Sequence, residues 1–334
     1  MEDVTRIVAD IKSGAIKPLY FLQGDEPYYI DKIAAYIEDN VLKEEERGFN
    51  QMLLYGRDVS IDEIISNAKR YPMMAERQVI IVKEAQDLSR SIENLVSYVE
   101  NPQPTTVLVF CYKYKTLDKR KKLAKALSKK GELFESKKLY DNQVGDWIRR
   151  VLSGRNYDIQ PKGAQMLVEF LGNDLSKISN ELDKLTVVIP KGKEITPQLI
   201  EENIGISKDF NNFELQKAIG EKQVVKANQI ITYFAHNQKS HPLIMSIAIL
   251  NSFFTKLLSF HGLKDKTKMS AAKSLKVNPY FVQDYITASR HYPMRKVSQI
   301  IGFLREADVK SKGVGANSLS DGDILKELVF RILH

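Results

Sequence analysis

Short apolar runs alternate with amphipathic segments through the first part of the chain, and this alternation restricts the fold more than any other feature of the sequence. The apolar runs have the length of buried strands: Leu19–Leu22, Gln51–Tyr55, Gln78–Val82, Thr106–Cys111 and Glu132–Glu135. Apolar residues at helical spacing fill the intervals between them: Tyr28–Leu42, Ile61–Arg70, Ile92–Val99 and Lys119–Lys129. Strands that alternate with helices form a mostly parallel sheet covered by helices. The sequence therefore predicts an α/β domain of nucleotide-binding type in residues 1–140.

The strand signal nearly vanishes after Asn142, and helical spacing takes its place. Helical segments follow at Asp146–Leu152, Pro161–Leu171 and Leu175–Leu185, and another starts after Thr196. Further helices are expected to begin near Phe213, Val224, Pro242, Ala271, Pro279, Met294 and Asp321. No fixed period repeats, so a solenoid is not expected. The sequence predicts two all-α domains, a small one in residues 141–208 and a larger one in residues 209–334.

The stretch PLYFLQGDEPYYIDK, residues 18–32, has the strand–turn–helix plan of a phosphate-binding loop without its chemistry. Such a loop needs glycines whose N–H groups surround phosphate, a Lys for the β- and γ-phosphates and a Ser or Thr for Mg²⁺. Here Asp25 and Glu26 would repel a triphosphate, and Pro27 lacks an N–H donor. The stretch therefore predicts a nucleotide-binding fold without nucleotide.

The acidic residues of an ATPase are missing as well. In a P-loop ATPase an apolar strand ends in Asp, usually followed by Glu, to hold Mg²⁺ and position water. The two strands that could serve end as QVIIVKEAQDL and TVLVFCYKYK. Glu84 is the nearest acid, and Lys83 stands where the metal-holding Asp would belong. Because two independent motifs are missing, we expect no catalytic residue, no metal site and no cofactor.

The overall composition indicates a soluble protein of the cytoplasm. The chain carries 50 basic and 42 acidic residues, and this modest excess permits a nucleic-acid partner without requiring one. The best apolar run, Leu243–Leu250, is far shorter than the ~18 residues of a membrane span, so no membrane contact is expected. The one cysteine, Cys111, lies in an apolar run and is expected to be a reduced core residue.

Basic residues are densest in Lys113–Lys138, and two interpretations remain open there. The first is a solvated helix face, with lysines outward and leucines inward. The second is a patch that contacts nucleic-acid phosphates without reading sequence. In the second interpretation the candidate phosphate contacts are Lys119, Arg120, Lys121 and Lys122.

Three other features are better explained by structure than by chemistry. Trp147 lies within a helical pattern and is expected in the core. His236 and His241 have no third ligand at a suitable spacing, so a metal site is not expected. Gly313-Val314-Gly315 follows no strand and predicts a loop between helices.

Five stretches resemble, in order along the chain, the delta subunit of the bacterial DNA polymerase III clamp loader. They are PLYFLQGDEPYYIDK, YPMMAERQVIIVKEAQDL, ENPQPTTVLVFCYKYKTLDKRKKLAKAL, FLGNDLSKISNELDKLTV and FNNFELQKAIGEKQVVKANQII. No single stretch is diagnostic, but their joint order is specific. The resemblance implies an AAA+-like N-terminal domain that lacks a nucleotide site, a helical lid domain and a helical C-terminal collar domain for assembly.

The resemblance also implies a function and a set of partners. A delta subunit binds the ring-shaped sliding clamp, the beta subunit, and favours its open form for loading onto primed DNA. It makes and breaks no bond itself. It works in a heteropentamer with ATP-binding motor subunits and a delta-prime subunit, and it meets primed DNA through that complex.

The resemblance bears on Met73 and Met74, in KRYPMMAERQVII. Pro72 ends the preceding helical pattern and the next strand begins near Gln78, so the pair lies in a connecting segment. From the residues alone, the favoured interpretation is that both methionines fold back onto the sheet edge as core. The family, however, carries its clamp-contacting hydrophobic pair in this segment, and the resemblance therefore implies that Met73 and Met74 bind the clamp.

Two functions of other classes stay open at this point. One is an AAA+ ATPase with a diverged phosphate loop, which would bind ATP saturably with Mg²⁺. The other is a free-standing basic nucleic-acid-binding protein, whose affinity for DNA would fall steeply with salt.

Overall fold

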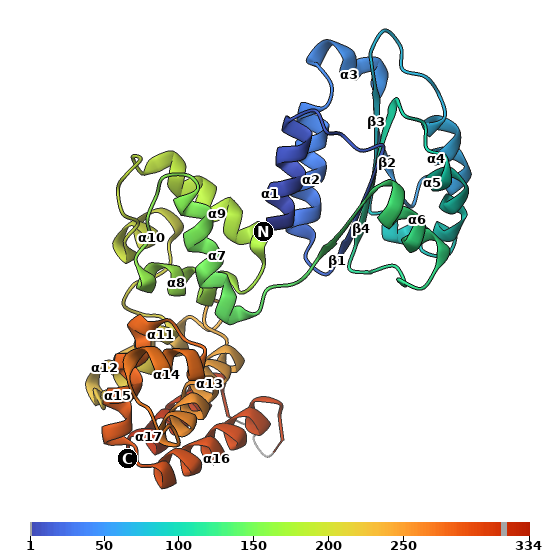
Figure 1. The fold of residues 1–334 in the computed structure, drawn as a ribbon. Coiled ribbons are helices and arrows are strands. Elements are labelled where there is room, and N and C mark those ends of the chain that lie inside the picture. The colour runs from blue at the N-terminus through green and yellow to red at the C-terminus, as the bar shows by residue number, and fades with distance from the viewer. Residues whose placement is uncertain (1, 315–318) are drawn as a thin grey trace. The chain divides into compact units, whose positions relative to one another are not determined.

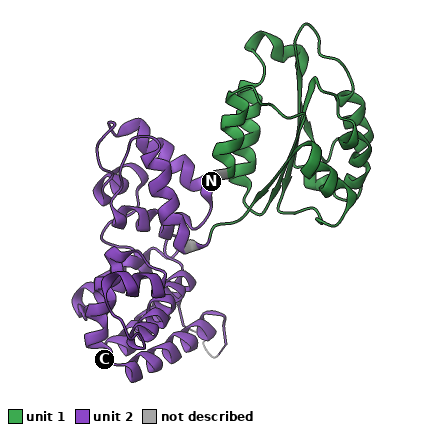
Figure 2. Ribbon diagram, in the orientation of Figure 1, with its two compact units in different colours: residues 1–139 green, residues 140–334 purple. Residues whose placement is uncertain are grey.

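The computed structural model describes residues 2–314 and 319–334 of the chain. The chain forms two compact units, of which the first ends at Leu139 and the second starts at Tyr140 (Figure 2). The predicted further division of the helical part into residues 141–208 and 209–334 stays a prediction. Each unit has its own hydrophobic core.

The first unit is built around a five-stranded parallel sheet with the order β2-β3-β4-β1-β5. The strands are β1 (Leu19–Gly24), β2 (Gln51–Tyr55), β3 (Gln78–Lys83), β4 (Thr106–Lys113) and β5 (Glu132–Ser136). The α-helices are α1 (Glu2–Lys12), α2 (Pro27–Asn40), α3 (Glu44–Asn50), α4 (Ile61–Ala68), α5 (Val96–Glu100) and α6 (Lys122–Lys130). Two 3₁₀ helices, η1 (Ala85–Leu88) and η2 (Ile92–Leu95), precede α5. All five predicted strands are confirmed.

Helices cover both faces of this sheet. Figure 1 shows α1 and α2 on one face and α4, α5 and α6 on the other. Every residue of the interior strand β1 is buried, and in the neighbouring central strand β4 only Lys113 is partly exposed. Phe21 of β1 lies opposite Phe110 of β4, and their rings stack with centroids 5.6 Å apart. A parallel sheet buried on both faces needs such continuous apolar strands, and the predicted α/β class is confirmed.

Most helices of this unit agree with the sequence pattern to within about two residues, but the start of α6 and the whole of α3 do not. The pattern over Lys119–Lys129 becomes a helix only at Lys122, because Asp118 first forms a tight turn in which its carboxylate accepts the N–H of Arg120 at 3.0 Å. Helix α3 is not predicted at all. Its seven residues, EEERGFN, contain one large apolar side chain, Phe49, and therefore no apolar repeat.

The second unit is all-helical in its described residues, apart from one isolated bridge between Ile159 and Ile195. Its first helices are α7 (Asp141–Ser153), α8 (Pro161–Leu171), α9 (Leu175–Val188) and α10 (Pro197–Ile204). Then follow α11 (Asn212–Gly220), α12 (Val224–His236), α13 (Leu243–His261), α14 (Lys268–Leu275), η3 (Pro279–Phe281), α15 (Val282–His291), α16 (Met294–Ser311) and α17 (Asp321–Leu333). The predicted helices are confirmed. Of the loop predicted around Gly313-Val314-Gly315, residues 315–318 lie outside the described residues.

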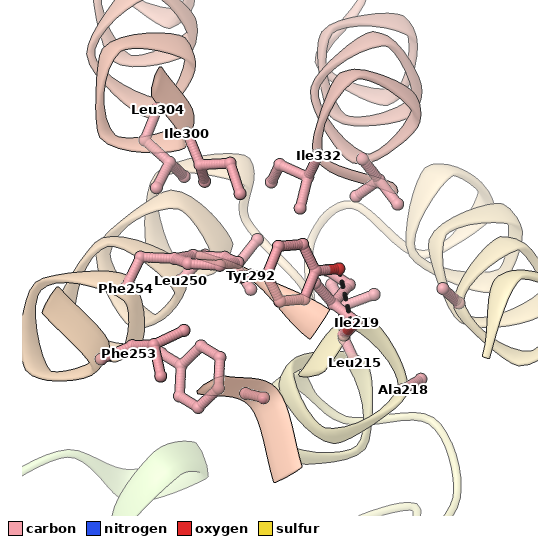
Figure 3. Packing of buried hydrophobic residues seen from close by; sticks show 14 of the residues in the cluster. Leu215, Ala218, Ile219, Leu250, Phe253, Phe254, Tyr292, Ile300, Leu304 and Ile332 are labelled. Atoms are coloured by element: carbon pink, nitrogen blue, oxygen red, sulfur yellow. Dashed lines mark hydrogen bonds between the residues drawn. The ribbon is translucent and has the colours of Figure 1, made fainter. Parts of the chain in front are cut away.

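Aromatic side chains pack among aliphatic ones in the hydrophobic core of the second unit (Figure 3). Phe253 and Phe254 of α13 pack edge to face, and Phe254 meets the ring of Tyr292 with centroids 5.5 Å apart. The buried hydroxyl of Tyr292 donates a hydrogen bond to the carbonyl oxygen of Ile219 at 2.8 Å. The one polar atom of these three side chains is therefore satisfied inside the core.

Helix α13 corrects the expectation that the longest apolar segment ends at Leu250. The polar residues after Leu250 do not stop the helix, which runs for 19 residues to His261 and is long and apolar enough to cross a membrane. Length and composition alone are weak evidence for a membrane span, because the core helix of a globular unit has the same properties. One face of α13, from Leu243 to Phe260, is buried in the core of the second unit.

Two carboxylates connect α8 to α11 within the second unit. Glu169 of α8 accepts the backbone N–H groups of Asn212 and Phe213, the latter at 3.0 Å, and so satisfies the first turn of α11. Glu214 of α11 is buried and forms ion pairs with Lys162 of α8, at 2.6 Å, and with Lys226 of α12. Burial raises the pKa of Glu169 to about 7, against the opposing effect of the two N–H donors. The junction is therefore sensitive to protonation.

Candidate functional site

α/β proteins hold nucleotides at the carboxyl ends of their parallel strands. Here the connection between β1 and α2 fills the space at those ends. Only Asp25 and Glu26 separate β1 from α2. Gly24 has a φ of +124°, and a Cβ at this position would lie 2.0 Å from the carbonyl oxygen of Ser136. The same carbonyl accepts the N–H of Asp25 at 3.0 Å. The connection is therefore pinned against β5 and is too short to wrap around phosphate groups.

The amino end of α2 is also taken by the protein's own carboxylate. Glu26 is buried, and its Oε1 accepts the N–H of Tyr28 at 3.1 Å as the N-cap of the helix. Ser136 holds Glu26 in place, because its hydroxyl donates to the Glu26 carbonyl oxygen at 2.7 Å. A helix N-terminus in this position would otherwise attract phosphate. The side chain of Glu26 occupies this position instead.

Next to the β1–α2 connection, the side chain of Lys113 fills the space at the carboxyl ends of β3 and β4. Lys113 Nζ lies 2.9 Å from a carboxylate oxygen of Asp31 and 2.8 Å from one of Glu84. Gln86 Nε2 donates to the second Glu84 oxygen at 2.7 Å. Burial raises the pKa of Glu84, but the hydrogen bonds from Lys113 and Gln86 outweigh it and hold that pKa below its usual value. Glu84 is thus an ion-pair partner rather than a base positioned for water.

The structure places Cys111 in the core of the first unit, and the other candidates, Trp147, His236 and His241, in the second unit. Cys111 is buried in β4, and burial raises the pKa of its thiol to about 12, so the thiol is unreactive at neutral pH. Trp147 is buried in α7 as predicted. His241 stacks on Phe234 with ring centroids 4.2 Å apart, and His236 lies at hydrogen-bond distance from the Thr232 carbonyl oxygen.

The methionine pair lies at the opposite edge of the sheet, where β2 and β3 begin. Both side chains are at the surface rather than in the core, with 62% of Met73 and 104% of Met74 exposed. Met74 has a φ of +52°, which is uncommon for a residue with a side chain. Tyr71 in the same segment and Phe49 of α3 are exposed as well. Large apolar side chains exposed in this way indicate an interaction surface.

Two side chains that the sequence analysis did not single out fix this segment. Gln78 Nε2 donates to the carbonyl oxygen of Arg70 at 2.6 Å and to Thr106 Oγ1 at 2.8 Å, which ties the end of α4 to the sheet. Asn50, the last residue of α3, donates to the carbonyl oxygen of Met73 at 2.9 Å and accepts its N–H at 2.7 Å. The exposed pair is therefore held on a fixed backbone.

The four basic candidates lie together before and at the start of α6, and all four are exposed. Three of them have a carboxylate partner: Lys119 with Glu135 at 2.9 Å, Arg120 with Asp118 at 2.8 Å and Lys121 with Glu93 at 3.6 Å. For Lys122, no ion pair forms within the described residues. Exposed ion pairs are weak, so these partners do not prevent contact with phosphate, which remains a prediction.

Comparisons with known proteins agree with this arrangement of a parallel α/β unit and an all-α unit. The family model "DNA polymerase III, delta subunit" matches residues 20–137, and the model "DNA polymerase III delta subunit, C-terminal domain" matches residues 209–320. The DNA polymerase III subunit delta of Bacillus subtilis is 29% identical over 315 residues, which cover 90% of each chain.

Solved structures show the same relationship. The Bacillus subtilis DNA clamp loader delta protein is 25% identical, covers 99% of both chains and superposes with a TM-score of 0.55. The Thermotoga maritima RuvB Holliday junction branch migration motor, at 15% identity and a TM-score of 0.35, is too distant to support an argument. The fold is that of a clamp-loader subunit. The chain belongs to the family of delta subunits of the bacterial DNA polymerase III clamp loader.

Proposed function

We propose that this chain is a non-catalytic clamp-loader subunit that binds the sliding clamp and favours its open ring for loading onto primed DNA. The observation that carries the proposal is the exposed pair Met73 and Met74, held on a fixed backbone in a member of the delta family. Methionine is flexible and polarizable, and it suits insertion into an apolar pocket of a partner.

The proposed action is thermodynamic rather than chemical. A protein shifts a ring from closed to open only by as much as it binds the open form more tightly. We therefore expect the purified chain to bind a clamp with a weakened ring interface more tightly than the intact closed clamp, measured as two equilibrium dissociation constants. Equal affinity for both forms would contradict the opening role while leaving clamp binding intact.

ATP is proposed to act through other subunits, because the nucleotide edge is occupied by Glu26 and by the Lys113 ion pairs. We expect no saturable ATP binding at micromolar concentrations with Mg²⁺ and no hydrolysis, measured by calorimetric titration and phosphate release. ATP turnover that survives re-purification and disappears on substitution of Asp25 or Glu26 would favour the diverged ATPase instead.

The proposed partners are the sliding clamp (beta subunit), the ATP-binding motor subunits and the delta-prime subunit, in a heteropentamer of the cytoplasm. The second unit, which contains the proposed collar, exposes large apolar side chains on several of its helices: Val225, Ile244, Met269 and Phe330. Such side chains suit assembly with other subunits. Primed DNA is proposed to be reached through the complex, with Lys119, Arg120, Lys121 and Lys122 as candidate phosphate contacts.

A further inference from the structure

The side chain of Asn50 is buried at the end of α3, beside the exposed methionine pair, and each of its polar atoms is used. Its Nδ2 donates to the carbonyl oxygens of Glu46, at 3.1 Å, and of Met73, at 2.9 Å. Its Oδ1 accepts the N–H of Met73 at 2.7 Å. Only 5% of Asn50 is exposed. Asn50 thus binds both backbone groups of Met73, much as a neighbouring strand would.

The hydrogen bonds to Met73 lie directly beside a residue with an uncommon backbone conformation. Met74 follows immediately, in a left-handed backbone conformation and with its whole side chain in solvent. A residue other than glycine holds that conformation only when its surroundings impose it. The exposed side chain of Met74 makes no buried contact that could impose this conformation. By contrast, Asn50 hydrogen-bonds both the N–H and the carbonyl oxygen of the preceding residue, Met73. The geometry of the pair therefore depends on Asn50.

We propose that Asn50 is a positioning residue for clamp binding: it holds Met73 and Met74 in the exposed conformation that enters the clamp. This inference rests on the proposed function, in which the pair is the clamp contact. A segment that is already ordered loses less freedom on binding. If the competent conformation is only partly populated, the apparent affinity falls by that fraction.

The amide group is specifically suited to this role. An amide both donates and accepts, and Asn50 does both with Met73. Aspartate has the same shape but accepts only, so Asn50→Asp would place a carboxylate against the carbonyl oxygens of Glu46 and Met73. The substitution removes both bonds that Nδ2 donates, keeps an acceptor for the Met73 N–H, and changes the volume little.

The experiment compares full-length wild type with Asn50→Asp. We expect clamp affinity to fall about tenfold or more and hydrogen exchange at the Met73 amide to accelerate. The amides of Leu53 in β2 and Ile81 in β3, whose strands pair, should stay protected. Asn40→Asp is the matched control, because Asn40 Nδ2 also donates to a carbonyl four residues earlier, at 2.9 Å, but is exposed on α2. It should leave affinity unchanged.

A double-mutant cycle with Met73→Ser and Met74→Ser separates this role from a general effect on stability. In the double-serine background, Asn50→Asp should cause no further loss of affinity. An additive loss, faster exchange throughout β2 and β3, or unchanged affinity of Asn50→Asp beside a weakened methionine variant would each overturn the positioning role while leaving the proposed function in place. Unchanged affinity of the double-serine variant would overturn the clamp contact itself, and the role of Asn50 with it.

Discussion

Replacing Met73 and Met74 together by serine is expected to weaken binding to the sliding clamp by about two orders of magnitude or more and to leave the melting temperature unchanged. Burial of one large apolar side chain in a partner contributes roughly 1.5–3 kcal/mol, and each 1.4 kcal/mol changes a dissociation constant about tenfold. The folded chain loses little, because Met74 lies fully in solvent and most of Met73 is exposed as well. Surface plasmon resonance and thermal unfolding of the same preparation measure both quantities.

The control for this pair is a second pair of exposed methionines in the other unit. Met269 is 71% exposed and Met294 is 48% exposed, so their replacement by serine removes similar chemistry from a different surface. Clamp affinity should not change in that variant. If the Met73 and Met74 variant instead melts at a much lower temperature and binds the clamp normally, the two residues act as core and the proposed contact is wrong.

The free energy of unfolding of the second unit is expected to fall as pH rises from 5 to 8, and Glu169→Gln should remove part of that dependence. Glu169 has an ordinary pKa of 4.5, and burial raises it to about 7 in the folded chain. Between these values the folded chain binds more protons than the unfolded chain, so stability falls with rising pH. The contribution is complete below pH 4.5, is lost through pH 7, and amounts to about 3 kcal/mol by the usual conversion.

Two other carboxylates, Glu214 and Asp284, affect the pH dependence of this unit differently from Glu169. Glu214 is held ionised: burial raises its pKa, but Lys162 and Lys226 outweigh this and lower it below 4.5. Asp284 on α15 has its pKa raised by burial to about 6, so it contributes at lower pH. The variant Asp284→Asn measures the contribution of Asp284 to the pH dependence of stability separately.

The measurement for Glu169 is urea unfolding of wild type and Glu169→Gln at several pH values between 5 and 8. The stability of wild type minus that of the variant should decrease across this range, because only wild type must ionise a buried carboxyl group. A difference that is constant with pH, or one that grows, would show that the N–H groups of Asn212 and Phe213 keep Glu169 ionised throughout.

Much of the fold could be predicted from the sequence because the strands are buried on both faces. Such strands leave continuous apolar runs, and β1 and β4 consist of them. The local pattern around Met73 and Met74 favoured the core, and that interpretation is wrong, because an apolar pair in a connection can also form an interface. The family resemblance favoured the surface, and the structure places both side chains there.

Two residues that fix distant segments, Asn50 at the methionine pair and Glu169 at the start of α11, left no local signal. Asn50 bonds to a residue 23 positions later, and Glu169 to backbone groups 43 and 44 positions later. In the sequence, each is a polar residue within a helical segment, and nothing in the local pattern distinguishes it from an exposed polar residue. Their roles follow only from the three-dimensional approach of distant segments, and periodicity does not report this.

The close approach of Gly24 to Ser136 determines how easily this domain could acquire a phosphate-binding loop. Substituting phosphate-loop residues into the existing chain would not suffice, because two residues span the connection and the neighbouring strand already fills the space above Gly24. A working loop would need inserted residues and, at the same time, a displaced end of β5. Single substitutions in the existing connection are therefore not expected to create a phosphate-binding loop in this domain.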